Sequence, residues 1–210
     1  MTEISERTKE RLLKLMQVFE KRILAGNIES VTSAQAEQLT GWSRDTIRKD
    51  ISSLGTASGG NSGYDPQALV PLIKKALGLN RRRKFCVVGL GRLGSAYLNV
   101  TPPELAEFDL AAGFDINVNR VEILRSPAPL YPAYKLGEVI NRFAIEIALL
   151  CIPAEAAQET AEKCIAAGIR GFLNFAPVAL RLPPDIAVLD VYIAEGLRSL
   201  AVTMNNEEIV

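Results

Sequence analysis

Apolar positions in the first part of the chain recur at helical spacing. Residues 6–25 carry an apolar stripe with the period of a helix, which predicts an amphipathic helix. Thr32, followed three residues later by Gln35, matches a capping box, so a second helix is expected to begin there and to end near Gly41. Residues 43–54 repeat the amphipathic pattern. The sequence therefore predicts three consecutive helices.

The short turn at residues 40–42 joins the second and third helices, as in a helix-turn-helix, in which the start of the second helix enters the DNA major groove. The small-residue loop at 55–64 has the position of the wing of a winged helix, and residues 66–77 predict a fourth helix. Polar, outward positions near the start of the third helix are the candidate DNA contacts: Ser43, Arg44, Thr46, Arg48 and Lys49. A solvated helix face is the alternative for these charges, and Asp50 is expected to be an internal ion-pair partner.

From residue 85 onward, apolar segments alternate with helical ones, which predicts an α/β domain with a parallel sheet between helices. The expected strands are 85–88, 110–114, 145–152, 171–174 and 186–191, and the expected helices include 93–99 and 154–167. The basic run at residues 81–84 marks the expected boundary. We therefore expect a winged-helix DNA-binding domain at 1–80, a Rossmann-type domain at 81–191 and a C-terminal helix within 192–210.

Three glycines follow the first expected strand at the dinucleotide-binding spacing. Gly89, Gly91 and Gly94 stand between a strand and a helix, and this context makes the pattern informative. The first glycine permits a tight turn, the second lets the backbone approach a pyrophosphate, and the third lets the helix pack closely on the strand. The pyrophosphate is expected at the helix N-terminus. The predicted cofactor-binding turn comprises Gly89, Leu90, Gly91, Arg92, Leu93 and Gly94.

Asp115 lies 21 residues after Gly94, at the end of the second expected strand. The dinucleotide fingerprint asks for a carboxylate at this place, where it accepts hydrogen bonds from the adenosine ribose hydroxyls. A carboxylate there also repels a 2′-phosphate, so the residues favour NAD(H) over NADP(H). An aspartate that only caps a turn is the alternative.

Composition and charge narrow the possible functions. The chain has no run of 18 apolar residues and begins with a polar segment, so we expect a protein that stays in the cytoplasm and does not span a membrane. It has no histidine, and Cys86, Cys151 and Cys164 have neither disulfide nor zinc spacing, so reduced thiols and no metal are expected. Residues 1–84 carry 15 Lys and Arg against 9 Asp and Glu, and the rest carry 9 against 15. This asymmetry favours a nucleic-acid module joined to a small-molecule domain.

The residues do not favour catalysis. A dehydrogenase needs a substrate site and usually a group that moves a proton, but only 19 residues follow the last expected strand. Cys151 and Asn174 are the suggestive polar groups near the expected crevice. Binding without turnover, as in a sensor, is therefore the preferred interpretation. A small NAD-dependent oxidoreductase whose helices only mediate assembly is the alternative.

With both halves in place, the chain resembles the Rex family of redox-sensing transcriptional repressors over nearly its full length. The resemblance rests on residues 46–51 in the third helix, 63–64 after the wing, 87–96 around the glycines, 114–115, 152–158, 167–171 and 174–177. It implies a homodimer that binds operator DNA, and whose DNA binding is permitted by NAD⁺ and disfavoured by NADH.

The resemblance also assigns roles to particular segments. It implies that a C-terminal helix, residues 194–204, is exchanged between subunits and packs near the partner's winged helix. By position, the nicotinamide end of the pocket is lined, beside Cys151, by Ile152, Pro153, Asn174, Phe175, Ala176 and Pro177.

Three features depart from the family pattern. Residues 56–62 lack the Lys or Arg that the family places between wing glycines, which is expected to weaken attraction to DNA. Tyr192 replaces an Asp, Ile193 replaces a usual aromatic residue, and Val100 replaces a frequent Tyr. The family's Asp and Tyr belong to a hydrogen-bond relay between nicotinamide, hinge and winged helix. A Rex-like DNA-binding protein with altered or lost redox sensing is therefore a further alternative.

Overall fold

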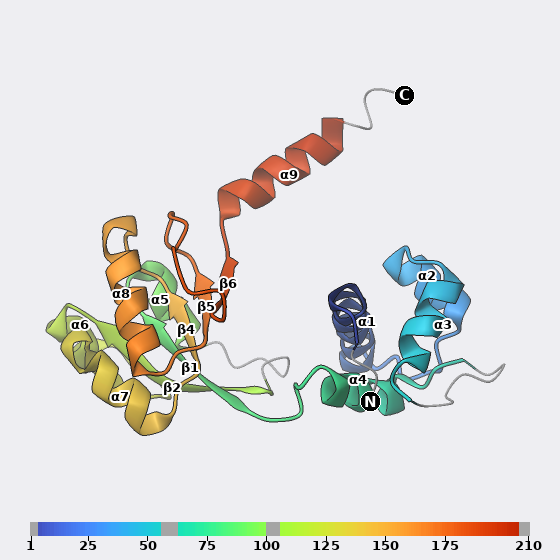
Figure 1. The fold of residues 1–210 in the computed structure, drawn as a ribbon, viewed down its shortest axis with the longest axis horizontal. Coiled ribbons are helices and arrows are strands. Elements are labelled where there is room, and N and C mark those ends of the chain that lie inside the picture. The colour runs from blue at the N-terminus through green and yellow to red at the C-terminus, as the bar shows by residue number, and fades with distance from the viewer. Residues whose placement is uncertain (1–3, 56–62, 100–105, 206–210) are drawn as a thin grey trace. The chain divides into compact units, whose positions relative to one another are not determined.

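The computed structural model describes residues 4–55, 63–99 and 106–205. The chain divides into two compact units, Met1–Arg82 and Arg83–Val210. Figure 1 shows helices α1 to α4 in the first unit and a sheet with its helices in the second.

The first unit consists of helices that begin at polar caps. Its helices are α1 (Glu6–Leu24), α2 (Ser33–Thr40), α3 (Arg44–Ser52) and α4 (Pro66–Ala76). Ser5, Thr32, Ser43 and Asp65 precede them, and each side chain accepts a hydrogen bond from a backbone N–H of the first turn. The capping box between Thr32 and Gln35 is confirmed, and Gly41 ends α2 in the left-handed conformation. These local signals explain why the four helix positions were predictable from sequence.

The apolar stripes of these helices meet in one core. Its largest fully buried members come from α1, α3 and α4: Leu12, Leu15, Phe19, Ile47, Ile51 and Ile73. Most of the expected wing at 55–64, namely residues 56–62, lies outside the described residues. Beside it, Tyr64 and Val31 form an antiparallel bridge in which each backbone N–H donates to the other carbonyl, at 2.9 and 2.8 Å.

The second unit is a six-stranded parallel sheet. Its strands are β1 (Arg83–Val88), β2 (Phe108–Asp115), β3 (Leu130–Pro132), β4 (Ile147–Leu150), β5 (Gly171–Asn174) and β6 (Ala187–Asp190). The order across the sheet is β3-β2-β1-β4-β5-β6, and every neighbouring pair is parallel. This is the doubly wound order of a Rossmann fold, so the predicted fold class is confirmed. The order reverses between β1 and β4, and ligands of such sheets bind beyond the strand ends at that point.

Helices cover both faces of the sheet. The helices of this unit are α5 (Arg92–Tyr97), α6 (Val118–Ile123), α7 (Leu136–Phe143), α8 (Ala154–Ala167) and α9 (Ile193–Asn205). Successive side chains of β1 point to opposite faces of the sheet. Cys86 and Val88 pack with α7 and α8 on one face. Phe85 and Val87 pack on the other face, with residues of α5 and of the segment after it.

Several boundaries differ from those expected from sequence. The expected strand 145–152 is too long, because Ile145 donates its N–H to Ile140 at the end of α7 and the strand runs only over Ile147–Leu150. The sequence pattern does not predict β3, because its three residues are too few to show the alternation of a strand. Helix α7 was also missed, although Leu136, Val139 and Ile140 are buried at helical spacing. Helix α6 buries no side chain and so carries no apolar stripe.

Helix α9 carries a long stripe of apolar residues that is exposed along its whole length. Figure 1 shows it extending beyond β6, away from the sheet. Ile193, Leu197, Leu200 and Met204 recur at helical spacing and are all exposed, by 60% or more. An apolar stripe of this kind on a helix that does not pack on its own sheet is typical of a protein interface.

Candidate functional site

The first glycine of the turn, Gly89, lies where β1 ends beside β4. Its φ of +90° is in the left-handed region that side-chain-bearing residues rarely adopt. A Cβ at this position would lie 2.5 Å from the carbonyl oxygen of Cys151 and 2.6 Å from the Ile152 side chain. The turn therefore requires glycine both for its backbone conformation and for its contact with the end of β4.

The other two glycines differ from each other in their surroundings. A Cβ on Gly94 would lie 1.8 Å from the carbonyl oxygen of Gly89, so α5 packs against the turn without room for a side chain. Gly91, which precedes α5, has no atom within 4 Å of a Cβ position among the described residues. This open space above the backbone is what the approach of a pyrophosphate requires.

The residues between the glycines face different environments. Leu90 is buried in the core under α5, and Arg92 and Leu93 are exposed on the first turn of α5. Leu90 therefore anchors the turn. Arg92 is exposed at the start of α5, and its contact with a phosphate stays a prediction.

Asp115 ends β2 and binds the glycine turn directly. One carboxylate oxygen, Oδ2, accepts the backbone N–H of Leu90 at 2.7 Å, and Oδ1 accepts that of Asn117 at 2.7 Å. The Arg120 guanidinium donates to Oδ2 at 3.1 Å. Burial by itself raises the pKa of Asp115, but these hydrogen bonds and the charge of Arg120 outweigh it, so the pKa lies below its ordinary value. The contact of Asp115 with ribose hydroxyls stays a prediction, and the structure adds that the carboxylate is 4% exposed and holds the turn.

Asn174 ends β5 and organises the loop that follows it. The side chain is fully buried, and its Nδ2 donates to Asp190 Oδ1 at 2.7 Å and to the Val178 carbonyl at 2.9 Å. Its Oδ1 accepts the N–H of Ala176 at 3.1 Å. These contacts fix the conformation of the loop through Pro177. Asn174 therefore positions the backbone of the loop at the place where the nicotinamide is expected.

The ends of β4 and β5 also bring apolar groups together near the glycine turn. The rings of Tyr97 and Phe175 pack with centroids 5.1 Å apart, in a cluster that includes Cys151. Burial raises the pKa of Cys151 to about 12, so its thiol is protonated at neutral pH and is no nucleophile. Pro153 precedes α8 directly after Ile152. No sequence pattern selects Tyr97, because its contact with Phe175 depends on the packing of α5 beside the end of β5.

One of the departures from the family pattern, Tyr192, lies among the described residues, close to Asn174. The Tyr192 hydroxyl is buried beside the Asn174 side chain and the Val178 backbone, although no hydrogen bond of good geometry joins it to a described residue. The carboxylate that contacts Asn174 belongs instead to Asp190, two residues earlier. Val100 lies outside the described residues.

The candidate DNA-contacting residues share the start of α3. Ser43 caps the helix through Thr46, accepting its backbone N–H at 3.3 Å and lying 2.9 Å from its hydroxyl. Arg44 donates to Glu37 of α2 at 2.8 Å, and Arg48 donates to Ser33 at 3.3 Å. Ser43, Arg44, Arg48 and Lys49 are exposed, and Thr46 is half-buried. The structure therefore places the candidates on one accessible part of the helix-turn-helix.

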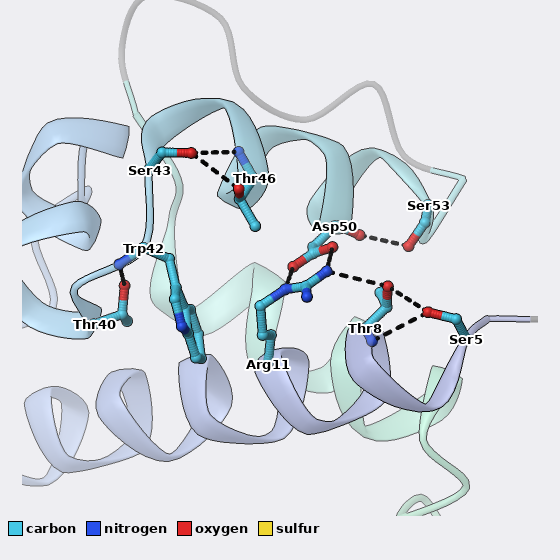
Figure 2. A network of polar contacts seen from close by, with 9 residues as sticks. All are labelled: Ser5, Thr8, Arg11, Thr40, Trp42, Ser43, Thr46, Asp50 and Ser53. Atoms are coloured by element: carbon cyan, nitrogen blue, oxygen red, sulfur yellow. Dashed lines mark hydrogen bonds and ion pairs between the residues drawn. The ribbon is translucent and has the colours of Figure 1, made fainter.

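A polar network holds α3 against α1, as Figure 2 shows. Arg11 of α1 donates to both carboxylate oxygens of Asp50, which is 6% exposed. This confirms the prediction that Asp50 is an internal ion-pair partner. Nearby, the Lys14 ammonium lies 5.5 Å from the ring centroid of Trp42, in the turn before α3. These contacts set the position of α3 within its unit.

The described residues contain no group of three or more His, Cys, Asp or Glu side chains that could hold a metal ion. Cys86, Cys151 and Cys164 form no disulfide. Within the same part of the chain, no helix is long and apolar enough to cross a membrane.

Comparisons with known proteins agree with this architecture. The sequence family described as "CoA binding domain" matches residues 80–178. The redox-sensing transcriptional repressor Rex of Thermus thermophilus is 36% identical over 198 residues, which cover 93% of this chain and 92% of that protein. The Rex repressor of Caldanaerobacter subterraneus subsp. tengcongensis is 30% identical over 189 residues, covering 90% and 84%.

Solved structures are similar over the whole chain. RSP, a Rex-family repressor, matches with a TM-score of 0.83 and 28% identity, covering 100% of this chain and 97% of RSP. RSP has been crystallised with β-NADH, and that structure also gives a TM-score of 0.83. The complex of RSP with β-NAD⁺ and operator DNA gives a TM-score of 0.84 at 28% identity, covering 100% and 96%.

Proposed function

Because the chain belongs to the Rex family of redox-sensing transcriptional repressors, we propose that it is a repressor that binds operator DNA and NAD(H) and is released from DNA by NADH. The observation that carries the proposal is the full-chain similarity to RSP, which was crystallised with β-NADH and with β-NAD⁺ on operator DNA. A repressor has to reach its operator, so its proposed place of action is the cytoplasm. The relatives are repressors, and the oxidoreductase alternative is set aside.

The dinucleotide is proposed to bind beyond the strand ends around the order reversal between β1 and β4. Gly89, Gly91 and Gly94 supply the backbone for its pyrophosphate, with Arg92 beside them. The loops after β4 and β5, containing Ile152, Pro153 and residues 174–177, supply the nicotinamide end. The contribution of the protein is binding and orientation, since the redox chemistry belongs to the dinucleotide.

Operator DNA is proposed to contact the start of α3. Ser43 and Thr46 offer hydroxyls to phosphates or bases, and Arg44, Arg48 and Lys49 supply cationic groups. The ion pairs and hydrogen bonds of the two arginines within the unit are exposed, so both side chains remain available to DNA.

The active form is proposed to be a homodimer. Helix α9 exposes Ile193, Leu197, Leu200 and Met204, which lie along one face of the helix. A second copy of the chain, related by two-fold symmetry, would remove this stripe from water. A dimer also matches the two half-sites of a symmetric operator.

A second candidate keeps DNA binding but loses the response to redox state. Tyr192 stands where the family has a carboxylate, and its buried hydroxyl beside Asn174 carries no charge; this specific observation favours the second candidate. In that case the dinucleotide would be a structural ligand with equal effects in both redox forms.

One titration distinguishes these functions. Labelled DNA from upstream genomic regions is titrated with protein by fluorescence anisotropy, without nucleotide, with NAD⁺ and with NADH. The proposed repressor loses affinity with NADH by about five- to 150-fold, the usual range of allosteric coupling. Equal affinities would favour the second candidate. Steady consumption of NADH with a carbonyl substrate would instead establish an oxidoreductase.

A further inference from the structure

Asp115 ends β2, where the adenosine ribose of a bound dinucleotide is expected, and its carboxylate is buried. This side chain is 4% exposed, and its two oxygens accept the N–H groups of Leu90 and Asn117. A carboxylate that selects against a 2′-phosphate has to face the ribose. Here it faces the glycine turn.

Arg120 balances the charge of Asp115 at the same place. Its guanidinium lies 3.1 Å from Asp115 Oδ2, and its side chain is 43% exposed. It therefore compensates the charge of Asp115. A guanidinium has five N–H donors, and among the described residues only one hydrogen bond from this group is formed. The remaining donors are available to an anion.

The segment between these two residues adds no negative charge. Residues 116–120 read Ile-Asn-Val-Asn-Arg, which contains one cation and no acidic side chain. Asn117 accepts the backbone N–H of Arg120 at 3.3 Å and caps α6. Ile116 is 90% exposed, so its apolar side chain is accessible to the adenine base of a bound dinucleotide. Glu122 also lies on α6, but residues two positions apart on a helix do not face each other.

We propose that this site accepts a 2′-phosphorylated dinucleotide, NADP(H), as well as NAD(H), and that Arg120 binds the 2′-phosphate. The inference rests on the proposed function, because it assumes that a dinucleotide lies on this glycine turn. An arginine near the end of β2 is the feature that accommodates a 2′-phosphate in Rossmann folds. A planar guanidinium can donate two parallel hydrogen bonds to a phosphate. The expected ligand preference therefore differs from the one that Asp115 predicts from sequence alone.

The test compares the dissociation constants of NADH and NADPH, measured by their fluorescence on the full-length protein. Two variants change the site: Arg120→Gln removes the cation, and Asn117→Asp adds a carboxylate while keeping a good helix cap. Arg170→Gln is the matched control, because Arg170 also lies near an aspartate, 3.6 Å from Asp185, but precedes β5 at the opposite end of the strands.

The wild-type protein is expected to bind NADPH within about tenfold of NADH, and Arg120→Gln to weaken NADPH by about tenfold while changing NADH less than about threefold. Asn117→Asp is also expected to weaken NADPH binding more than NADH binding. Arg170→Gln is expected to change neither dissociation constant. Wild-type protein that binds NADH but rejects NADPH by more than about a hundredfold would overturn the inference and leave the proposed function intact. An equal loss of both nucleotides in Arg120→Gln would show a structural role instead. If wild-type protein binds neither nucleotide, the proposed function fails, and the inference with it.

Discussion

Arg11 in α1 and Asp50 in α3 form a two-pronged ion pair, in which Nε donates to Oδ2 at 2.5 Å and Nη2 donates to Oδ1 at 2.7 Å. The Asp50 side chain is 8% exposed and that of Arg11 is 27% exposed. The Asp50 carboxylate raises the pKa of Arg11 above its ordinary value, chiefly through the hydrogen bond. The recognition helix is therefore tied to the first helix by a charge pair that is largely shielded from water.

Arg11→Met should destabilise the first unit, because it leaves the Asp50 carboxylate shielded and unpaired. The expected loss in the free energy of unfolding is about 2–3 kcal/mol, somewhat less than for a fully buried pair. Urea denaturation followed by circular dichroism measures it. Arg44→Met breaks the exposed pair with Glu37 and should cost less than about 1 kcal/mol. Equal losses in the two variants would contradict the role of the Arg11 pair.

Substitutions at two glycines of the turn should affect different properties, one the folding of the second unit and the other the binding of NADH. Gly94→Ala places a Cβ 1.8 Å from the Gly89 carbonyl oxygen, so the second unit should lose stability or fail to fold. Gly91→Ala meets no described atom within 4 Å and should fold normally, yet it should lose NADH binding because the Cβ takes the space of the pyrophosphate. Thermal unfolding and NADH fluorescence report the two properties. Gly91→Ala protein that binds NADH like wild type would contradict the assignment of the turn.

Arg48→Ala should weaken operator binding through the loss of one cation at the start of α3. For a phosphate contact, the slope of log affinity against log salt should fall by about one. For a base contact, the sequence preference should relax instead. Fluorescence anisotropy at several salt concentrations measures both. As a control, Arg170→Ala removes one positive charge from the second unit and should leave operator binding unchanged. Unchanged operator binding in Arg48→Ala would show that Arg48 does not contact DNA.

Asp115 should make stability depend on pH in the acid range. Its pKa is lower in the folded protein than in the unfolded chain, so the unfolded chain binds more protons between the two values and stability rises with pH there. The contribution is complete above about pH 5 and is lost as the pH falls through the folded pKa. Asp115→Asn should be less stable at pH 7 and should show a shallower dependence below about pH 4 in urea denaturation. The exposed Asp185→Asn is the control, and an unaltered pH profile in Asp115→Asn would contradict this account.

Helix α9 should decide the oligomeric state. Leu197→Glu with Leu200→Glu places two charges in the apolar stripe and should convert a dimer to a monomer, because the interface cannot desolvate them. Light scattering after size-exclusion chromatography measures the mass. Ser199→Glu adds charge on another face of α9 and should leave the dimer intact. A double variant that stays dimeric would place the interface elsewhere.

Much of the local structure was readable from the sequence. Cap residues such as Ser43 and Thr32 fix where helices begin, because their side chains satisfy backbone N–H groups only a few residues away. The glycine spacing likewise identified the turn, since each glycine answers a steric demand within one strand-turn-helix unit. By contrast, β3 and α6 were missed because neither carries a periodic apolar pattern of sufficient length.

The sequence by itself determined the two-part organisation, the parallel sheet and the glycine turn, because these depend on periodicity and short-range sterics. Only the tertiary structure decided which groups the polar side chains meet. The sequence predicts a ribose contact for Asp115, and the fold adds Leu90, 25 positions earlier, and Arg120 as protein partners. Asn174 meets Asp190 across neighbouring strands, and Arg11 meets Asp50 across two helices. The physical reason is that such hydrogen bonds and charge pairs form across elements distant in sequence, where spacing along the chain carries no information about distance in space.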